Sequence, residues 1–301
     1  MKRDFIALTD HNKETLERLV KRGVELKSGK KPESGSGKVL AMILNKPSTR
    51  TSVSFQVAMY RLGGTAIFLG SESLQMSRGE TVADTAKTLS RYVDAIMIRT
   101  YNHQDAVELA AAASVPVING LTDLLHPCQA LGDVMSLTEL KGNRYGDLHM
   151  AYIGDGNNVC NSLINAAGIF GFKFTAAVPE GYEPDPLITE QMQARNPQIK
   201  IVRDPDEAAC GADAVYTDVW VSMGDEGEGN VRNEIFKKYK VDMSLLKRAK
   251  PDVMVMHCLP AHRGEEISPE VIDGPHSYVF DQAENRLHIQ EAILEFLVKT
   301  V

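Results

Sequence analysis

Short apolar runs alternate with stretches of helical periodicity along most of the chain. Ten runs rich in aliphatic residues predict strands, and most have four to six residues with few polar positions, as is typical of strands buried in a parallel sheet. The predicted strands are Val39–Leu44, Ala66–Leu69, Ala95–Arg99, Val115–Asn119, His149–Ile153, Phe174–Val178, Lys200–Val202, Ala214–Thr217, Val253–His257 and Tyr278–Phe280. The intervening stretches, such as Ser52–Leu62 and Val159–Phe170, predict helices. This alternation indicates an α/β fold with right-handed crossovers.

The segment over residues 141–147 (KGNRYGD) is polar and rich in turn formers, and it separates the first four predicted strands from the other six. At roughly 150 residues per domain, the length of the chain suggests two domains. We therefore predict two doubly wound α/β domains, each with a central parallel sheet, over residues 1–140 and 141–284. A helix at Gln129–Leu140 would bridge them, and residues 285–301 would form a C-terminal helix that returns to the first domain.

The composition is that of a globular protein, with 43% hydrophobic and 24% charged residues, which excludes a disordered chain, a collagen and a coiled coil. The formal net charge of -7 is uneven, since residues 1–150 contain 19 basic and 16 acidic side chains and residues 151–301 contain 14 and 24. The four cysteines lie far apart, and no apolar run approaches the roughly 18 residues that span a bilayer. We expect a cytoplasmic protein with free thiols, and neither a membrane nor nucleic acid as a partner.

Polar side chains follow the first predicted strand, where the chain enters a helix. The sequence NKPSTRTS places the hydroxyls of Ser48, Thr49 and Thr51 and the guanidinium of Arg50 at a helix N-terminus. Hydroxyls, unpaired backbone N–H groups and a bidentate cation at the positive end of a helix dipole suit a phosphate group. An ordinary Ser/Thr N-cap is the alternative, but three hydroxyls around an arginine favour an anion site.

Other strand ends carry further candidates, because ligands of open α/β sheets bind beyond the carboxyl ends of the strands. Arg99 ends one apolar run, where it would pair with a buried carboxylate or with a ligand. His126 and Gln129 stand at the start of a helix that Pro127 initiates, and they could bind a carbonyl or an amide. Asp218 follows another strand and could bind an ammonium group.

Two further strand ends admit alternatives. The loop GDGNN resembles a dinucleotide-binding turn, but Val159 stands at the third glycine position, which disfavours a nicotinamide dehydrogenase. The two asparagines there suit an amino-acid head group equally well. His257, Cys258 and His262 could ligate a metal, but no complementary Cys/His pair has zinc spacing, so we expect no metal and no organic cofactor.

Four motifs in register then identify a family resemblance. KPSTRTSVSFQVAMYRLGG, HPCQALGD, DVWVSMG and HCLPAHRG occur in this order, and the resemblance runs from about Lys38 to Val301. Together they resemble the ornithine carbamoyltransferases, within the wider aspartate/ornithine carbamoyltransferase family. The resemblance implies transfer of the carbamoyl group of carbamoyl phosphate to the δ-amine of L-ornithine, giving L-citrulline and phosphate in arginine metabolism. It also implies a homotrimer, or a multiple of trimers, with shared active sites.

The resemblance further implies roles for individual residues of this chain. The phosphate would be cradled by Ser48, Thr49, Arg50 and Thr51, with Gln75 reaching into a neighbouring subunit's site. Carbamoyl phosphate would also contact Arg99, His126, Gln129, Cys258, Leu259 and Arg286. Ornithine would be bound by Asn158, Asp218, Ser222 and Met223. The catalytic residues would be Asp218 and Cys258, which orient the amine and assist its deprotonation, and Arg99 and His126, which with Thr51 stabilise the tetrahedral oxyanion.

One position departs from the family pattern. The family usually reads STRTR, whereas Ser52 takes the fifth place here. We expect activity to survive, because the first four residues carry the phosphate contacts, and phosphate affinity or local stability is what the change affects. Putrescine or an N-acylated ornithine are alternative acceptors, which the DVWVSMG motif disfavours. A catalytically silent relative is disfavoured by the intact STRT, HPCQ and HCLP motifs.

Overall fold

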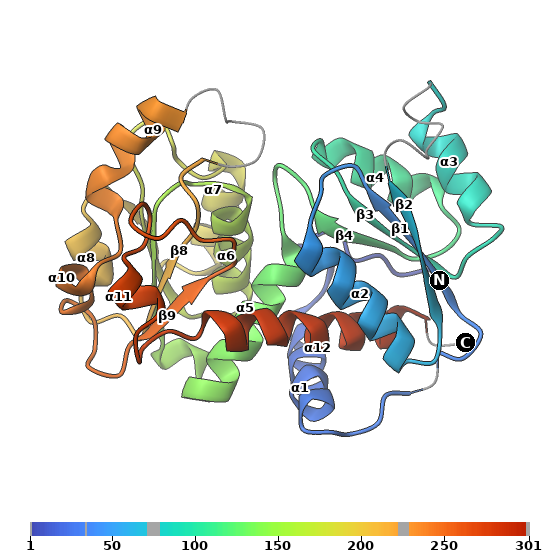
Figure 1. Ribbon diagram of the computed structural model, residues 1–301, viewed down its shortest axis with the longest axis horizontal. Helices are drawn as coiled ribbons and strands as arrows, with labels where there is room; N and C mark the ends of the chain where they lie inside the picture. The colour runs from blue at the N-terminus through green and yellow to red at the C-terminus, as the bar shows by residue number, and fades with distance from the viewer. Residues whose placement is uncertain (1, 34, 71–78, 222–228, 299–301) are drawn as a thin grey trace. The chain divides into compact units, whose positions relative to one another are not determined.

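The computed structural model describes residues 2–33, 35–70, 79–221 and 229–298 of the chain. The chain divides into two compact units. The first unit contains Met1–Glu139 and Glu284–Val301, and the second contains Leu140–Ala283. Each unit is built on a parallel sheet with helices on both faces, so the predicted α/β fold class is confirmed (Figure 1).

A four-stranded sheet in the order β2-β1-β3-β4 forms the centre of the first unit. Its strands are β1 (Val39–Leu44), β2 (Thr65–Gly70), β3 (Ala95–Arg99) and β4 (Val117–Leu121). Leu40 of β1 pairs with Ala66 on one side and with Ala95 on the other, in parallel register. The inner strands β1 and β3 are buried almost throughout, as their continuous apolar runs require, whereas the edge strand β2 is largely exposed.

Helices cover both faces of this sheet (Figure 1). Ile43 and Ile98 belong to a buried cluster that includes residues of α3 (Val82–Leu89) and α4 (His103–Ala112). The remaining helices of the first unit are α1 (Lys13–Lys27), α2 (Thr49–Arg61), α5 (Pro127–Lys141) and α12 (Val279–Val298), the last two of which continue into the second unit. Gly23 lets α1 approach its neighbours, since a Cβ there would lie 2.9 Å from Met135 Sδ and 3.3 Å from Ile289 Cδ1.

The second unit has a five-stranded sheet in the order β7-β6-β5-β8-β9. Its strands are β5 (His149–Ile153), β6 (Lys173–Ala177), β7 (Ile199–Val202), β8 (Ala214–Thr217) and β9 (Met254–His257). Ile153, Val215 and Val255 share one buried cluster with Val279, the first residue of α12, and with residues of four further α-helices. These helices are α8 (Pro205–Ala209), α9 (Gly229–Phe236), α10 (Met243–Leu246) and α11 (Pro269–Ile272). The helices α6 (Asn158–Phe170) and α7 (Pro186–Arg195) pack together on the opposite side of the sheet (Figure 1).

Nine of the predicted strands are present within two residues of the expected bounds, but the strand predicted at Tyr278–Phe280 is wrong. Tyr278 N–H donates to the Val255 carbonyl at 3.0 Å, and the chain then turns at once into α12, where Gln282 N–H donates to the Tyr278 carbonyl at 2.8 Å. Phe280 is 68% exposed, unlike a residue of a buried strand. A three-residue apolar run does not distinguish a strand from a helix start.

Among the described helices, none combines the length and the apolar character that crossing a membrane requires. Two thiols lie in the protein interior. Burial raises the pKa of the Cys128 thiol to about 12 and raises that of Cys160 as well, so both are protonated at neutral pH.

Candidate active site

Ser48 and Thr51 organise the turn that leads from β1 into α2. Ser48 is the N-cap of α2, and its Oγ accepts from the Thr51 backbone N–H at 3.2 Å and donates to Thr51 Oγ1 at 3.1 Å. An N-cap serine satisfies one N–H group of the first turn, so the local sequence fixes where the helix begins. Thr49 is exposed at the first helical position, and Arg50 follows it half-buried.

Two arginines from distant parts of the sequence converge on the Thr51 hydroxyl. Arg286 Nη2, on α12, donates to Thr51 Oγ1 at 3.0 Å, and Arg99 Nη1, at the end of β3, donates to the same oxygen at 3.5 Å. All three side chains are buried, and Arg99 Nε also donates to the Lys46 carbonyl at 3.2 Å. The structure thus brings three predicted phosphate contacts together at the start of α2.

His126 lies in the electrostatic field of these cations. Its pKa is well below 6.5, first because the ring is buried and then because Arg286, Arg99, Arg50 and Lys46 repel a proton there. The imidazole is therefore neutral at pH 7, with one nitrogen as donor and the other as acceptor. The positive charge of this group belongs to the arginines and the lysine, and buried guanidinium groups favour a phosphate dianion.

Gln129 lies in the first turn of α5, which begins at Pro127 as predicted. Its Nε2 donates to Asp133 Oδ1 at 2.8 Å, one helical turn further along, and both side chains are buried. Asp133 was not among the predicted site residues, although the i, i+4 spacing in HPCQALGD is the signal that could have indicated the pair.

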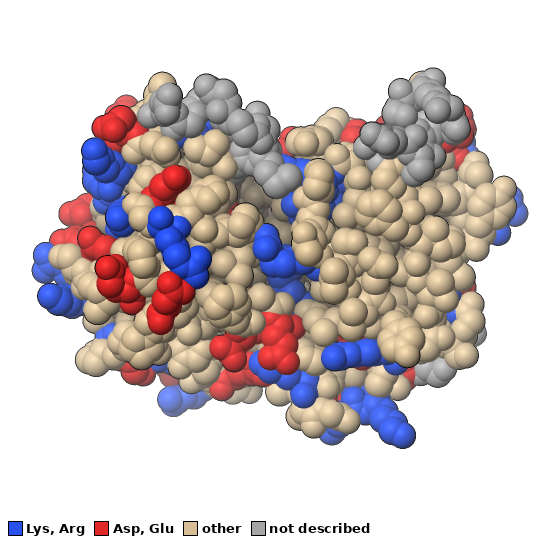
Figure 2. Space-filling view, in the orientation of Figure 1, with Lys and Arg blue, Asp and Glu red and all other residues tan. Residues whose placement is uncertain are grey.

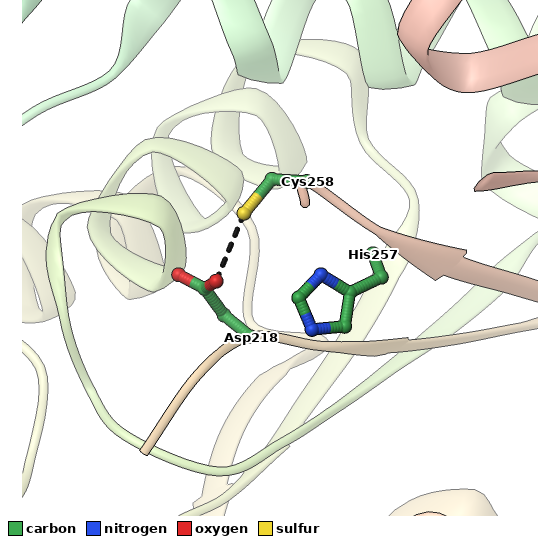
Figure 3. A group of neighbouring side chains, drawn as sticks. All are labelled: Asp218, His257 and Cys258. Atoms are coloured by element: carbon green, nitrogen blue, oxygen red, sulfur yellow. Dashed lines mark hydrogen bonds between the residues drawn. The ribbon is translucent and has the colours of Figure 1, made fainter. Parts of the chain in front are cut away.

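Asp218 directly follows β8 in the second unit, and neutral groups hold its carboxylate. Cys258 Sγ donates to Asp218 Oδ1 at 2.9 Å (Figure 3), and the Val219 backbone N–H donates to the same oxygen at 2.8 Å. Asn157 Nδ2 donates to Oδ2 at 2.8 Å. Since none of these three donors is charged, the buried carboxylate is fixed in place without neutralisation of its charge. A negative group at a strand end is suited to bind an ammonium ion.

Asn157, rather than Asn158, which the resemblance implied as an ornithine contact, is the asparagine of GDGNN that donates to Asp218. Asn157 is the N-cap of α6, where its Oδ1 accepts from the backbone N–H groups of Val159 at 3.0 Å and Cys160 at 3.2 Å. Its Nδ2 is then directed to Asp218, which is 61 residues away in the sequence. The pattern GDGNN before a helix could have predicted the cap but not this distant contact. Asn158 is half-buried at the first position of α6.

His257 fixes the backbone that carries Cys258 and Leu259. Its Nδ1 accepts from the Leu259 N–H at 2.9 Å, and its Nε2 lies 3.1 Å from Glu266 Oε1, both side chains being fully buried. Leu259 has a φ of 58°, a left-handed conformation that costs energy for a residue with a side chain. Side-chain ligand atoms of Asp218, His257 and Cys258 lie within 4.8 Å of one another, but a metal on His257 would displace one of its hydrogen bonds.

Three predicted site residues, Gln75, Ser222 and Met223, lie outside the described residues. Ser52, where the sequence departs from the family pattern, accepts from Gln56 Nε2 through both its Oγ and its carbonyl, each at 3.0 Å. The hydroxyl at this position therefore takes part in a local contact along α2.

Comparison with known proteins shows the family to which the two units belong. Residues 3–139 match the model of the carbamoyl-P binding domain of the aspartate/ornithine carbamoyltransferases, and residues 146–297 match that of their Asp/Orn binding domain. The chain is 52% identical to the ornithine carbamoyltransferase of Anoxybacillus flavithermus, over 98% of this chain and 96% of that protein. It is 50% identical to that of Methanoculleus marisnigri, over 99% and 97%.

Solved structures similar to this chain are also ornithine carbamoyltransferases. The ornithine carbamoyltransferase of Pyrococcus furiosus is similar with a TM-score of 0.95 at 49% identity, covering 99% of this chain and 98% of that one. The anabolic enzyme of Campylobacter jejuni has a TM-score of 0.93 at 39% identity, with 99% of both chains covered. Matches of this extent define the class of the protein, which is a carbamoyltransferase. The chain belongs to the aspartate/ornithine carbamoyltransferase family.

Proposed function

We propose that the protein transfers the carbamoyl group of carbamoyl phosphate to the δ-amine of L-ornithine, giving L-citrulline and phosphate. The observation that carries this proposal is the carboxylate of Asp218, held by Asn157 and Cys258 at the end of β8. Within a family named for aspartate and ornithine carbamoyltransferases, a buried carboxylate favours ornithine, which carries two ammonium groups and one carboxylate, over aspartate, which carries one ammonium group and two carboxylates. An aspartate acceptor would bring a second carboxylate and meet repulsion from Asp218.

Carbamoyl phosphate is the proposed ligand of the first unit. The phosphate would be bound by Ser48, Thr49, Arg50 and Thr51, with Arg99 and Arg286, and by Gln75 of a neighbouring subunit. The carbamoyl group would contact His126, Gln129, Cys258 and Leu259. Buried guanidinium groups around Thr51 support this assignment, since two such groups on one hydroxyl are suited to a doubly charged ligand.

Ornithine is the proposed ligand of the second unit, with contacts from Asn158, Asp218, Ser222 and Met223. An alkyl ammonium has a pKa of roughly 10.4, so the δ-amine must lose a proton before it can attack. Asp218 would orient this group and, with Cys258, assist the loss of its proton. The Cys258 thiol donates to Asp218, so it acts here as a hydrogen-bond donor rather than as a nucleophile.

The transfer itself follows from these positions. The neutral amine nitrogen forms a bond to the carbonyl carbon, and the carbonyl oxygen becomes the oxyanion of a tetrahedral intermediate. Arg99, Thr51 and the neutral His126 are the donors proposed to stabilise this oxyanion. Collapse of the intermediate breaks the bond from carbon to the bridging oxygen and releases phosphate, whose charge the arginines stabilise. The amine nitrogen gives up its second proton as citrulline forms, and the departing phosphate takes it up.

We also propose a homotrimer, or a multiple of trimers, as the working form. The edge strand β2 exposes Ile67 by 46% and Phe68 by 54%, and the adjacent α2 exposes Val53 and Tyr60. Figure 2 shows that the surface over α2 and β2 is mostly uncharged. An apolar edge strand left open to water is prone to pair with another chain, so a second copy is the proposed cover. Light scattering should give three times the chain mass or a multiple of it, and Phe68→Lys should lower that value.

The proposal includes a cytoplasmic reaction in arginine biosynthesis. Its test is a competition assay with labelled carbamoyl phosphate and four acceptors, L-ornithine, L-aspartate, putrescine and N-acetylornithine. We expect citrulline as the dominant product. Preferential labelling of putrescine or N-acetylornithine would favour the alternative acceptors, and preferential labelling of aspartate would overturn the role given to Asp218.

A further inference from the structure

The pair formed by Gln129 and Asp133 has a consequence for ligand selection. Gln129 Nε2 donates to Asp133 Oδ1 at 2.8 Å, and both side chains are at most 1% exposed. An amide side chain has a donor end and an acceptor end of the same shape, and its orientation follows from its hydrogen-bond partners. A carboxylate only accepts hydrogen bonds, so Asp133 requires the NH₂ end of Gln129 to face it.

The opposite end of the Gln129 amide is then an acceptor. Its Oε1 is buried and has no hydrogen-bond partner among the described residues. A buried carbonyl oxygen without a donor costs free energy, and native proteins rarely leave one unsatisfied. The chemical group that would satisfy this oxygen is an N–H donor. A carboxylate of the same shape would face it with a second acceptor and be repelled.

We propose that Asp133 is a positioning residue that sets the amide of Gln129 so that its Oε1 selects an NH₂ group on the phosphate-bearing ligand. This inference rests on the proposed function, in which Gln129 contacts the carbamoyl group. It adds a reason why the site accepts a carbamoyl group and rejects a carboxylate of the same size. Asp133 acts through Gln129 and does not touch the ligand.

The Asp133→Asn variant tests this inference, since it keeps the shape of the side chain and adds a donor. The amide of Gln129 can then rotate by half a turn and present its NH₂ group to the ligand. Two ligands of nearly identical shape serve as probes. Phosphonoacetamide carries an amide beside the phosphonate, and phosphonoacetate carries a carboxylate there.

The quantity to measure is the ratio of the two dissociation constants, by calorimetry on the full-length protein. We expect the preference for the amide over the carboxylate to fall by about tenfold or more in Asp133→Asn, partly through tighter binding of phosphonoacetate. Loss of packing alone would weaken both ligands together and leave the ratio unchanged. Asp133→Ser, which removes the carboxylate with a smaller side chain, is scored in the same way should Asp133→Asn fold poorly.

A double-mutant cycle separates the orientation of the amide from the loss of a negative charge. In a Gln129→Met background the amide is absent, so Asp133→Asn should leave the ligand ratio within about twofold. An equal change in both backgrounds would mean that Asp133 acts directly through its charge, which overturns the inference. A wild-type protein that binds neither ligand would overturn the proposed function. One that binds phosphonoacetamide, with a ratio that Asp133→Asn does not change, would overturn this inference alone.

Discussion

The two units differ in the charge of an oxygen atom that accepts several hydrogen bonds and in the charge of the groups that donate to it. In the first unit the Thr51 hydroxyl receives hydrogen bonds from two guanidinium groups, those of Arg99 and Arg286. In the second unit the Asp218 carboxylate accepts hydrogen bonds from three neutral donors of the described residues, an amide, a thiol and a backbone N–H. Guanidinium groups are fixed positive charges at pH 7, and two of them at one place favour an anionic ligand. A carboxylate held by neutral donors keeps its charge for a cation.

The pKa of His126 also reflects the positive charge of the first unit. Burial of the ring, and then the four cations around it in the first unit, lower its pKa, so this ring does not add a fifth positive charge at pH 7. The unit therefore concentrates fixed charges that do not titrate near neutral pH. Affinity of the first unit for a phosphate dianion should follow the ionisation of the ligand rather than that of the protein.

The largest expected effect is that of removing one cation from the first unit. Arg50→Ala should lower turnover by about 1000-fold, because the half-buried Arg50 guanidinium is proposed to bind phosphate and would contribute to both affinity and leaving-group stabilisation. The measurement is citrulline formation at saturating ornithine. Arg91→Ala removes an exposed arginine of the same unit and is the control, with activity expected to stay within twofold. Near-normal activity of Arg50→Ala would contradict the assignment of Arg50 to the phosphate site.

The second largest effect is expected from removing the negative charge of Asp218 in the second unit. Asp218→Asn keeps the size of the side chain but removes its charge, so kcat/KM for ornithine should fall by about 100-fold or more. Binding of phosphonoacetamide should stay within about twofold of wild type. A variant that carbamoylates ornithine at close to the wild-type rate would show that the ammonium does not depend on this carboxylate.

A smaller effect is expected from the amide that holds Asp218. Asn157→Ser retains an N-cap oxygen for α6 but cannot donate to Asp218 through an amide. Loss of one hydrogen bond to a charged group should lower kcat/KM for ornithine by about tenfold. The melting temperature provides the control, since a retained cap should leave it nearly unchanged. Equal losses in ornithine and phosphonoacetamide binding would argue for general damage instead.

The smallest effect concerns pH and stability. The folded-state pKa of His126 lies well below the ordinary value of 6.5, so the unfolded chain binds a proton first as the pH falls. The stability that this ring contributes is fully present above 6.5 and is lost progressively below it. His126→Gln should therefore show a shallower loss of unfolding free energy between pH 7 and pH 5 than wild type. Identical slopes in denaturant titrations would contradict the lowered pKa.

The positions of the candidate side chains relative to the strand ends could be predicted from the sequence. Parallel strands place their carboxyl ends at one edge, so residues that follow apolar runs, such as Arg99 and Asp218, were natural candidates. The start of α12 at Val279 could not be predicted, because three consecutive apolar residues show neither the periodicity of a strand nor that of a helix. The contact with Val255 that ends there depends on the rest of the sheet.

The contacts between side chains that are distant in the sequence could not be predicted. Asn157 and Asp218 are 61 residues apart, and Thr51 and Arg286 are 235 apart, so only the folded chain reveals these pairs. Asp133 was missed for another reason. From the sequence alone, a carboxylate within a helix is expected to form an ordinary ion pair. Its role becomes apparent only when its contact with the Gln129 amide, and the buried Oε1 of that amide without a partner among the described residues, are seen in the structure.

The central claim is that opposite charges in the two units bind opposite charges of two substrates. It is tested most directly by measuring phosphonoacetamide binding in Arg50→Ala and Asp218→Asn side by side. We expect Arg50→Ala to weaken binding by about 100-fold and Asp218→Asn to leave it within about twofold of wild type. Equal weakening in both variants, or undiminished binding in Arg50→Ala, would contradict it.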